Sequence, residues 1–129
     1  MIILDLNLNG VLVSSEHPKV LADFYQKIFD SEPGCSGGEF VGWKVGNGFF
    51  TVGPHSDVKG KNDTPGRIML FLETNDVEGE YKRIMELGAK NVQEPYHPEE
   101  AGDMWLATLE DPDGNYFQLA SPMELPDSK

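Results

Sequence analysis

The chain has 129 residues, of which 39% are hydrophobic, so it can form about one domain with its own buried core. Twenty-two acidic and ten basic residues give a formal net charge of −12, which argues against nucleic acid or an anionic membrane as the main partner. No apolar stretch approaches the roughly 20 residues that cross a bilayer. The first residues do not resemble a signal peptide, and the single cysteine, Cys35, can form no internal disulfide. We therefore expect a cytoplasmic protein.

The first half of the chain predicts a strand, a helix and further strands. Apolar and polar residues alternate over residues 6–14, which is typical of a strand with one buried face. A helix is expected from Pro18, because proline suits the first helical position. The apolar residues at helical spacing after it are Leu21, Phe24, Tyr25 and Ile28. Two short strands follow in FVGWKV and FFTVG, joined by a hairpin turn at residues 46–48.

The second half shows the same order of elements. Residues 67–73 predict a strand, and Asn75 or Asp76 can cap the helix that follows, which Gly88 ends. A strand near residues 90–93 leads into a loop. The last pattern is a hairpin, MWLATLE and NYFQLAS, whose strands are separated by the turn sequence DPDG.

The order strand, helix, and two or three strands therefore occurs twice, at an offset of roughly sixty residues. This pattern predicts an α+β protein made of two modules within one domain spanning residues 1–129. Module 1 is expected at about residues 5–54 and module 2 at about residues 67–122. The mostly polar residues 54–66 form the connector between them.

Three stretches carry a resemblance to a known superfamily: SSEHPKVLADFYQKIF, LETNDVEGEYKRIMELGA and MWLATLEDPDGNYFQL. Together they resemble the vicinal oxygen chelate superfamily, which comprises glyoxalases, bleomycin-resistance proteins and ring-cleaving dioxygenases. The resemblance covers about residues 7–122. It implies paired βαβββ modules whose strands curl into an open mixed sheet around a small-molecule cavity, with the helices outside. It also implies frequent homodimerisation.

The same resemblance implies where a metal would bind in metal-dependent members. Three of the matching positions here are Gly10 (or Asn9, if the alignment shifts by one), Met69 and Gln118. The position of the fourth ligand falls within residues 49–53, which contain no carboxylate or imidazole. Divalent cations need carboxylate, imidazole or similar donors. A glycine, a thioether and an uncharged amide do not supply them. We therefore expect no metal and no other cofactor in this protein.

Strand alternation indicates which side chains would line a metal-free cavity. If Gln118 faces inward, so does Tyr116, and a four-residue DPDG connection would pair Gln118 with Ala107 and place Trp105 on the same face. If Met69 faces inward, Arg67 and Phe71 do so too. Trp43 is a further candidate whose facing is open. The expected ligand-binding residues are Trp43, Arg67, Met69, Phe71, Trp105, Tyr116 and Gln118. The alternative is that these side chains only fill the core.

Three functions remain open on this basis. The favoured one is a metal-free protein that binds a small organic molecule of cationic or aromatic character. It accounts for the missing metal ligands and for residues 91–128, which contain no Lys or Arg. The second is a lyase or dioxygenase-type enzyme with a non-standard or metal-independent site built from Arg67, Glu73, Tyr116 and Gln118. The third is a structural or regulatory role without a ligand. A second copy of the chain is the expected protein partner.

Overall fold

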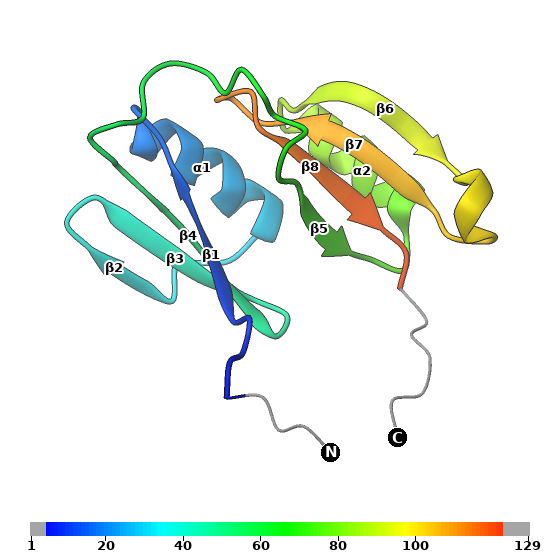
Figure 1. Cartoon of the computed structure of the whole chain (residues 1–129), viewed down its shortest axis with the longest axis horizontal. Helices are drawn as coiled ribbons and strands as arrows, with labels where there is room; N and C mark the ends of the chain where they lie inside the picture. Colours follow the sequence, from blue (N-terminus) through cyan, green and yellow to red (C-terminus); the bar gives the residue numbers. More distant parts are fainter. Residues whose placement is uncertain (1–4, 123–129) are drawn as a thin grey trace. The chain divides into compact units, whose positions relative to one another are not determined.

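The computed structural model describes residues 5–122 and contains two βαβββ modules, each with a four-stranded mixed sheet and one α-helix (Figure 1). The boundary between two compact units of the chain lies between Gly60 and Lys61. This arrangement confirms the predicted α+β fold class with paired modules. Within residues 5–122, no helix is both long enough and apolar enough to span a membrane.

Module 1 contains five elements: β1 (Gly10–Ser14), α1 (Pro18–Phe29), β2 (Cys35–Gly37), β3 (Phe40–Val45) and β4 (Gly48–Gly53). Its strands lie in the order β1-β4-β3-β2, with β1 parallel to β4 and the other pairs antiparallel. The hairpin between β3 and β4 has the predicted position. The short edge strand β2 lies in the glycine-rich stretch after the helix.

The first strand is shorter than its sequence pattern predicts. Residues 6–14 alternate throughout, but β1 begins at Gly10, which pairs with Phe49. Its partner β4 begins only one residue earlier in the register, so within residues 5–122 no strand pairs with Leu6 and Leu8. These two side chains are 87% and 97% exposed. Alternation alone therefore does not make a strand where hydrogen-bonding partners are missing.

The helix α1 begins where the sequence predicts. Pro18 occupies the first turn, and the buried Ser15 side chain accepts a hydrogen bond from the His17 N–H at 2.9 Å. The predicted apolar stripe is buried and packs on the sheet, with the Tyr25 and Phe50 ring centroids 4.6 Å apart. The helix ends at Asp30, which adopts the left-handed conformation with φ of 50°.

Module 2 repeats the topology with one short additional helix. Its elements are β5 (Leu70–Glu73), α2 (Val77–Glu86), β6 (Lys90–Tyr96), the 3₁₀ helix η1 (Glu99–Ala101), β7 (Leu106–Glu110) and β8 (Tyr116–Ala120). The strands lie in the order β5-β8-β7-β6, and β5 runs parallel to β8. Asp76 is the residue that caps α2, since its carboxylate accepts the Gly79 N–H at 3.0 Å.

The turn between β7 and β8 is organised by one buried carboxylate. Asp111 is 2% exposed, and its Oδ1 accepts the backbone N–H groups of Asp113 at 2.9 Å and Asn115 at 3.0 Å. The Asn115 side-chain amide donates to the same carboxylate at 2.9 Å. Asn115 therefore belongs to the turn, and the first strand pair beyond it is Glu110 with Tyr116.

This longer connection shifts the strand register from the predicted one. The sequence predicted a four-residue connection that would pair Gln118 with Ala107. In the structure Gln118 pairs with Thr108, and Ala120 pairs with Leu106. Because directly paired residues share a face of the sheet, Thr108 and Leu106 lie on the face of Gln118. The predicted placement of Trp105 on that face is wrong.

The connector is anchored at two points that lie close together in the sequence. The Gly60 N–H donates to the Glu16 carboxylate at 2.9 Å, and this hydrogen bond holds the pKa of Glu16 below its ordinary value. Two residues further on, the Asn62 N–H donates to the Asp113 carbonyl at 2.8 Å. The Asn62 side-chain amide also donates to Asn115 Oδ1 at 2.9 Å.

Candidate functional site

The sheet of module 2 has a face packed on α2 and an opposite face, which we call the open face. Phe117, Leu119 and Leu109 are buried on the helix side, at 2% exposure or less. The residues between them in the strands point to the open face. One row on that face crosses all four strands in register and consists of Phe71, Gln118, Thr108 and Gln93.

The centre of this row is an uncharged hydrogen-bonded pair. Gln118 Nε2 donates to Thr108 Oγ1 at 3.0 Å, and the two residues are only 8% and 6% exposed. Sequence reasoning identified Gln118 but missed Thr108, because the register was predicted one residue away. The signal that could have revealed it is Asn115, which follows the DPDG sequence and extends the turn by bonding to Asp111.

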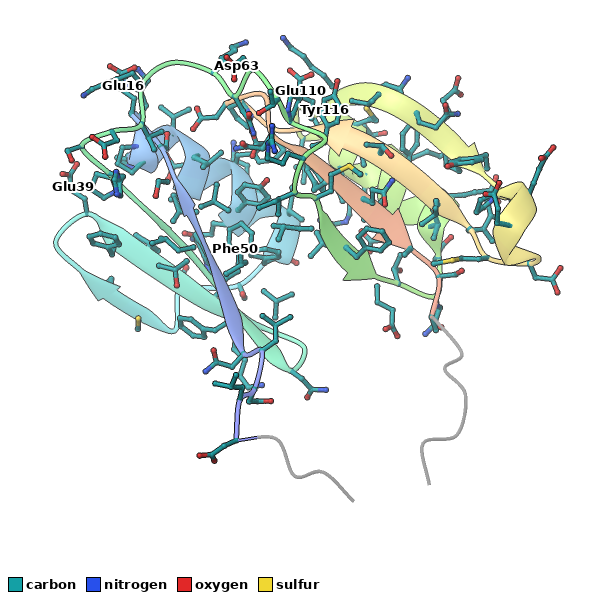
Figure 2. The ribbon with its side chains drawn as sticks, in the orientation of Figure 1. Glu16, Glu39, Phe50, Asp63, Glu110 and Tyr116 are labelled. Carbon is teal, nitrogen blue, oxygen red and sulfur yellow. The ribbon has the colours of Figure 1, made fainter. Side chains whose placement is uncertain are left out.

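Aromatic and acidic side chains surround the central pair on the open face. Phe71, next to Gln118, is 51% exposed. At one end Tyr116 lies opposite Glu110, which in turn pairs with Lys90 (Figure 2).

At the other end of the open face lies a second row across the four strands. Its members are Glu73, Ala120, Leu106 and Tyr96. The open face therefore combines hydrogen-bonding groups, aromatic rings and the two carboxylates Glu73 and Glu110.

Two of the predicted site residues lie outside the sheet of module 2. β5 begins at Leu70, so Arg67 and Met69 precede it, although the sequence predicted a strand over residues 67–73. Arg67 is exposed, and its N–H donates to the Thr64 carbonyl at 3.1 Å in a turn. Met69 is half-buried just before the strand. Neither belongs to the row that contains Gln118.

Trp105 precedes β7 and packs beside the loop after β6. Its ring centroid is 4.0 Å from that of His97, whose Nδ1 lies 3.0 Å from the Met104 carbonyl oxygen. The Trp105 N–H donates to the Ser121 hydroxyl at 2.9 Å. The structure therefore does not bring this ring to the Gln118–Thr108 pair.

Trp43 lies in the core of module 1. It has no exposed surface, it pairs with Phe50, and its ring centroid is 5.6 Å from that of Phe29 on α1. The ring therefore faces the helix and packs as a core residue, which is the alternative that the sequence left open. Among residues 5–122, no acceptor hydrogen-bonds its buried Nε1.

In module 1, the face of the sheet that points away from α1 is formed by aromatic rings lying over glycines. Phe49 covers Gly42, and Phe40 covers Gly53, so a side chain at either glycine would collide with a ring. Leu12 is exposed on the same face. Residues 49–53, where the resemblance places one metal ligand, contribute Phe49 and Thr51 to this face and no carboxylate or imidazole.

The side chains at the remaining positions also do not fit a divalent cation. Gly10 has no donor atom, and a Cβ built there would lie 2.9 Å from the Phe49 carbonyl oxygen, so even a substituted ligand would need a backbone shift. The Gln118 amide nitrogen already donates to Thr108. Among residues 5–122, no three His, Cys, Asp or Glu side chains are grouped as a metal site requires.

Comparison with known proteins identifies the family. The family model described as "Glyoxalase-like domain" matches residues 10–120. A search of curated proteins found no match.

Three solved structures show the same fold at low sequence identity. A glyoxalase/bleomycin resistance protein/dioxygenase family enzyme from Burkholderia phytofirmans PsJN is 18% identical, with a TM-score of 0.73 over 92% of this chain and 100% of that one. A glyoxalase-related enzyme from Fulvimarina pelagi is 16% identical, with a TM-score of 0.73 over 90% and 88% of the two chains. A genomically encoded fosfomycin resistance protein from Listeria monocytogenes is 17% identical, with a TM-score of 0.65 over 95% and 96%. The family match and the two βαβββ modules together show that this chain belongs to the glyoxalase-like domain family of the glyoxalase/bleomycin-resistance/dioxygenase superfamily.

Proposed function

We propose that this protein binds a small aromatic molecule, preferably a cationic one, on the open face of module 2 without a metal ion. The observation that carries the proposal is the buried, uncharged Gln118–Thr108 pair. It occupies the centre of the face, and Gln118 stands at the position that the resemblance assigns to a metal-binding carboxylate. An amide and a hydroxyl can hydrogen-bond an organic ligand, whereas they bind divalent cations poorly.

The surroundings of the pair support an aromatic and cationic ligand. Phe71, Tyr116 and Tyr96 present rings on the same face. A cation over such a ring gains about 0.5–2 kcal/mol. Glu73 and Glu110 add two carboxylates, of which Glu110 has Lys90 as its neighbour. The net charge of −12 favours the approach of cations further.

A thermal-shift screen of cationic, neutral and anionic aromatic compounds tests the proposal, since a ligand that binds the folded state raises the melting temperature. Stabilisation by cationic and neutral compounds is expected, and it should be lost in Phe71→Ala. Val20→Ala is a suitable control, because Val20 is an exposed residue on α1. Stabilisation mainly by anions, or equal loss in both variants, would contradict the proposed site.

Metal content provides an independent test. Protein purified without an affinity tag should contain no stoichiometric Ni, Zn, Fe or Mn, and a chelator should leave its melting temperature unchanged. A reproducible one-to-one metal content that disappears in Gln118→Ala would favour the enzyme hypothesis instead.

We also propose that two chains associate. Large apolar side chains such as Leu12 and Phe40 are exposed in the chain by itself, and a symmetric partner is the simplest way to cover apolar surface. Light scattering should then give twice the chain mass of 14.3 kDa. A mass of one chain at all micromolar concentrations would refute the dimer.

A further inference from the structure

We infer that Thr108 sets the ligand selectivity of this face by fixing the orientation of the Gln118 amide, so that the site selects aromatic ligands carrying an N–H donor. The inference rests on the proposed binding function and specifies its ligand class. Thr108 acts through Gln118 in this scheme and is therefore a positioning residue.

The orientation follows from the hydrogen bond within the pair. Gln118 Nε2 donates to Thr108 Oγ1 at 3.0 Å, so the carbonyl oxygen Oε1 points away from Thr108. Among residues 5–122, this oxygen accepts no hydrogen bond. The Thr108 hydroxyl accepts one hydrogen bond and keeps its own hydrogen for donation. The pair thus offers a ligand one carbonyl acceptor and one hydroxyl donor.

The unused acceptor belongs to a largely buried pair but is itself accessible. Both residues are more than nine-tenths buried, yet Oε1 is not one of the fully buried polar atoms without a partner, so a ligand donor can reach it. A hydrogen bond made in such surroundings is stronger than one made in bulk water. A ligand N–H can supply that bond to Oε1. A carboxylate cannot, since its oxygens would face Oε1 and the nearby Glu73 and Glu110. A quaternary ammonium group cannot either, because it has no N–H.

The ligand class that fits is a planar aromatic compound with an amide, amidine or ring-amine group. Its ring can contact Phe71, which is exposed and lies directly beside Gln118 in register. Its N–H can reach Oε1. In an amide, the carbonyl oxygen can also accept the Thr108 hydroxyl hydrogen, whereas a cationic amidine has no acceptor and binds through its N–H groups alone. Charge is secondary in this scheme, so the neutral amide and the cationic amidine are both ligands.

Four probes that share a phenyl ring separate the N–H requirement from charge: benzamide, benzamidine, phenyltrimethylammonium and benzoate. We expect benzamide and benzamidine to bind at least about tenfold more tightly than the other two in NMR titrations, which corresponds to one additional hydrogen bond. Thr108→Val removes the acceptor while keeping the shape of the side chain, and the preference should fall several-fold. Thr108→Ser keeps the hydroxyl and should retain the preference.

The side-chain NH₂ resonances of Gln118 give a readout that simple loss of packing would not produce. In the wild type and in Thr108→Ser, one of the two amide hydrogens should be protected from exchange, and in Thr108→Val neither should be. An unprotected amide in the wild type would overturn the inference whether or not Thr108→Val folds.

The outcomes distinguish this inference from the proposed function. Binding of phenyltrimethylammonium as tightly as benzamidine would overturn the N–H requirement and leave the cationic site intact. An unchanged probe order in Thr108→Val would overturn the role of Thr108. Absence of binding by all four probes would overturn both proposals.

Discussion

Replacing Gln118 by glutamate tests whether the centre of the open face is dry and uncharged. The substitution exchanges one nitrogen for an oxygen and keeps the shape of the side chain. In the native protein this side chain is 8% exposed and donates to Thr108. A carboxylate cannot donate, and the neighbours of Gln118 in register, Phe71 and Thr108, carry no positive charge. The introduced charge is therefore buried without a positive partner, and a hydrogen bond from the Thr108 hydroxyl offsets only part of the cost.

The size of the effect follows from the pKa of the introduced carboxyl group. Its unfolded value is about 4.3, and burial raises the value in the folded state. Each unit of increase corresponds to about 1.36 kcal/mol, so a rise of one to two units costs about 1.4–2.7 kcal/mol of unfolding free energy. At pH 3 the introduced carboxyl group is protonated in both the folded and the unfolded state, so the unfolding free energy of the variant is close to that of the wild type. The cost grows as the pH rises above about 4 and becomes constant above the folded pKa.

Urea denaturation of Gln118→Glu and the wild type at pH 3, 5 and 8 measures this cost directly. Gln93→Glu is a matched control, because Gln93 belongs to the same row but is exposed on the edge strand β6, where a charge remains hydrated. Equal stability of Gln118→Glu and the wild type at pH 8 would show that the side chain at position 118 is hydrated and would refute the burial of this position. Stabilisation of the variant by added Zn²⁺ would show that one carboxylate suffices to create a metal site, although zinc sites in proteins ordinarily have three or four protein ligands.

Three further substitutions test features that shape the modules. Gly42→Ala should destabilise the protein by about 1–3 kcal/mol in urea denaturation, because its Cβ collides with the covering ring, whereas Gly37→Ala, with open space around it, should have little effect. Asp111→Ala leaves part-buried N–H groups of the β7–β8 turn without their acceptor and should cost about 1–3 kcal/mol, so unchanged stability would contradict its role. Glu16 has a lowered folded pKa, so it contributes stability above its unfolded pKa that is lost as the pH falls through the folded value. Glu16→Gln should therefore shrink the stability difference between pH 7 and pH 3, and an unchanged difference would show that the Gly60 hydrogen bond is not maintained in solution.

The order of the elements and both hairpins could be predicted from sequence, whereas the register of the β7–β8 pair could not. Helical spacing and cap residues are local signals, and both helices begin where these signals place them. The pairing of β7 with β8 depends on Asn115, whose side chain joins the Asp111 network and lengthens the turn by one residue. That single residue decides that Thr108, and not Ala107, lies beside Gln118.

The facing of Trp43 and the start of β1 depend on contacts distant in sequence. Trp43 pairs with Phe50, and both side chains lie on the face of the sheet that packs on α1. The sequence FVGWKVGNGFF does not show which face of the sheet these two residues occupy. Residues 6–9 continue the alternating pattern of a strand, but the pairing of β1 begins at Gly10 because its partner β4 extends no further. The open-face residues Phe71, Tyr116 and Gln118 were predicted as a group because alternation within each strand is local.

The two anchors of the connector make neighbouring amides into separate reporters of the two modules. Gly60 and Asn62 are separated only by Lys61, yet Glu16 holds the first N–H and the β7–β8 turn holds the second. Hydrogen exchange at these amides therefore follows two different local opening reactions. The acceptor of the first hydrogen bond is the titratable Glu16 carboxylate, whereas the acceptor of the second is the backbone carbonyl of Asp113, which does not titrate. A substitution or ligand that destabilises one module can thus be assigned to that module by comparing the exchange rates of the Gly60 and Asn62 amides.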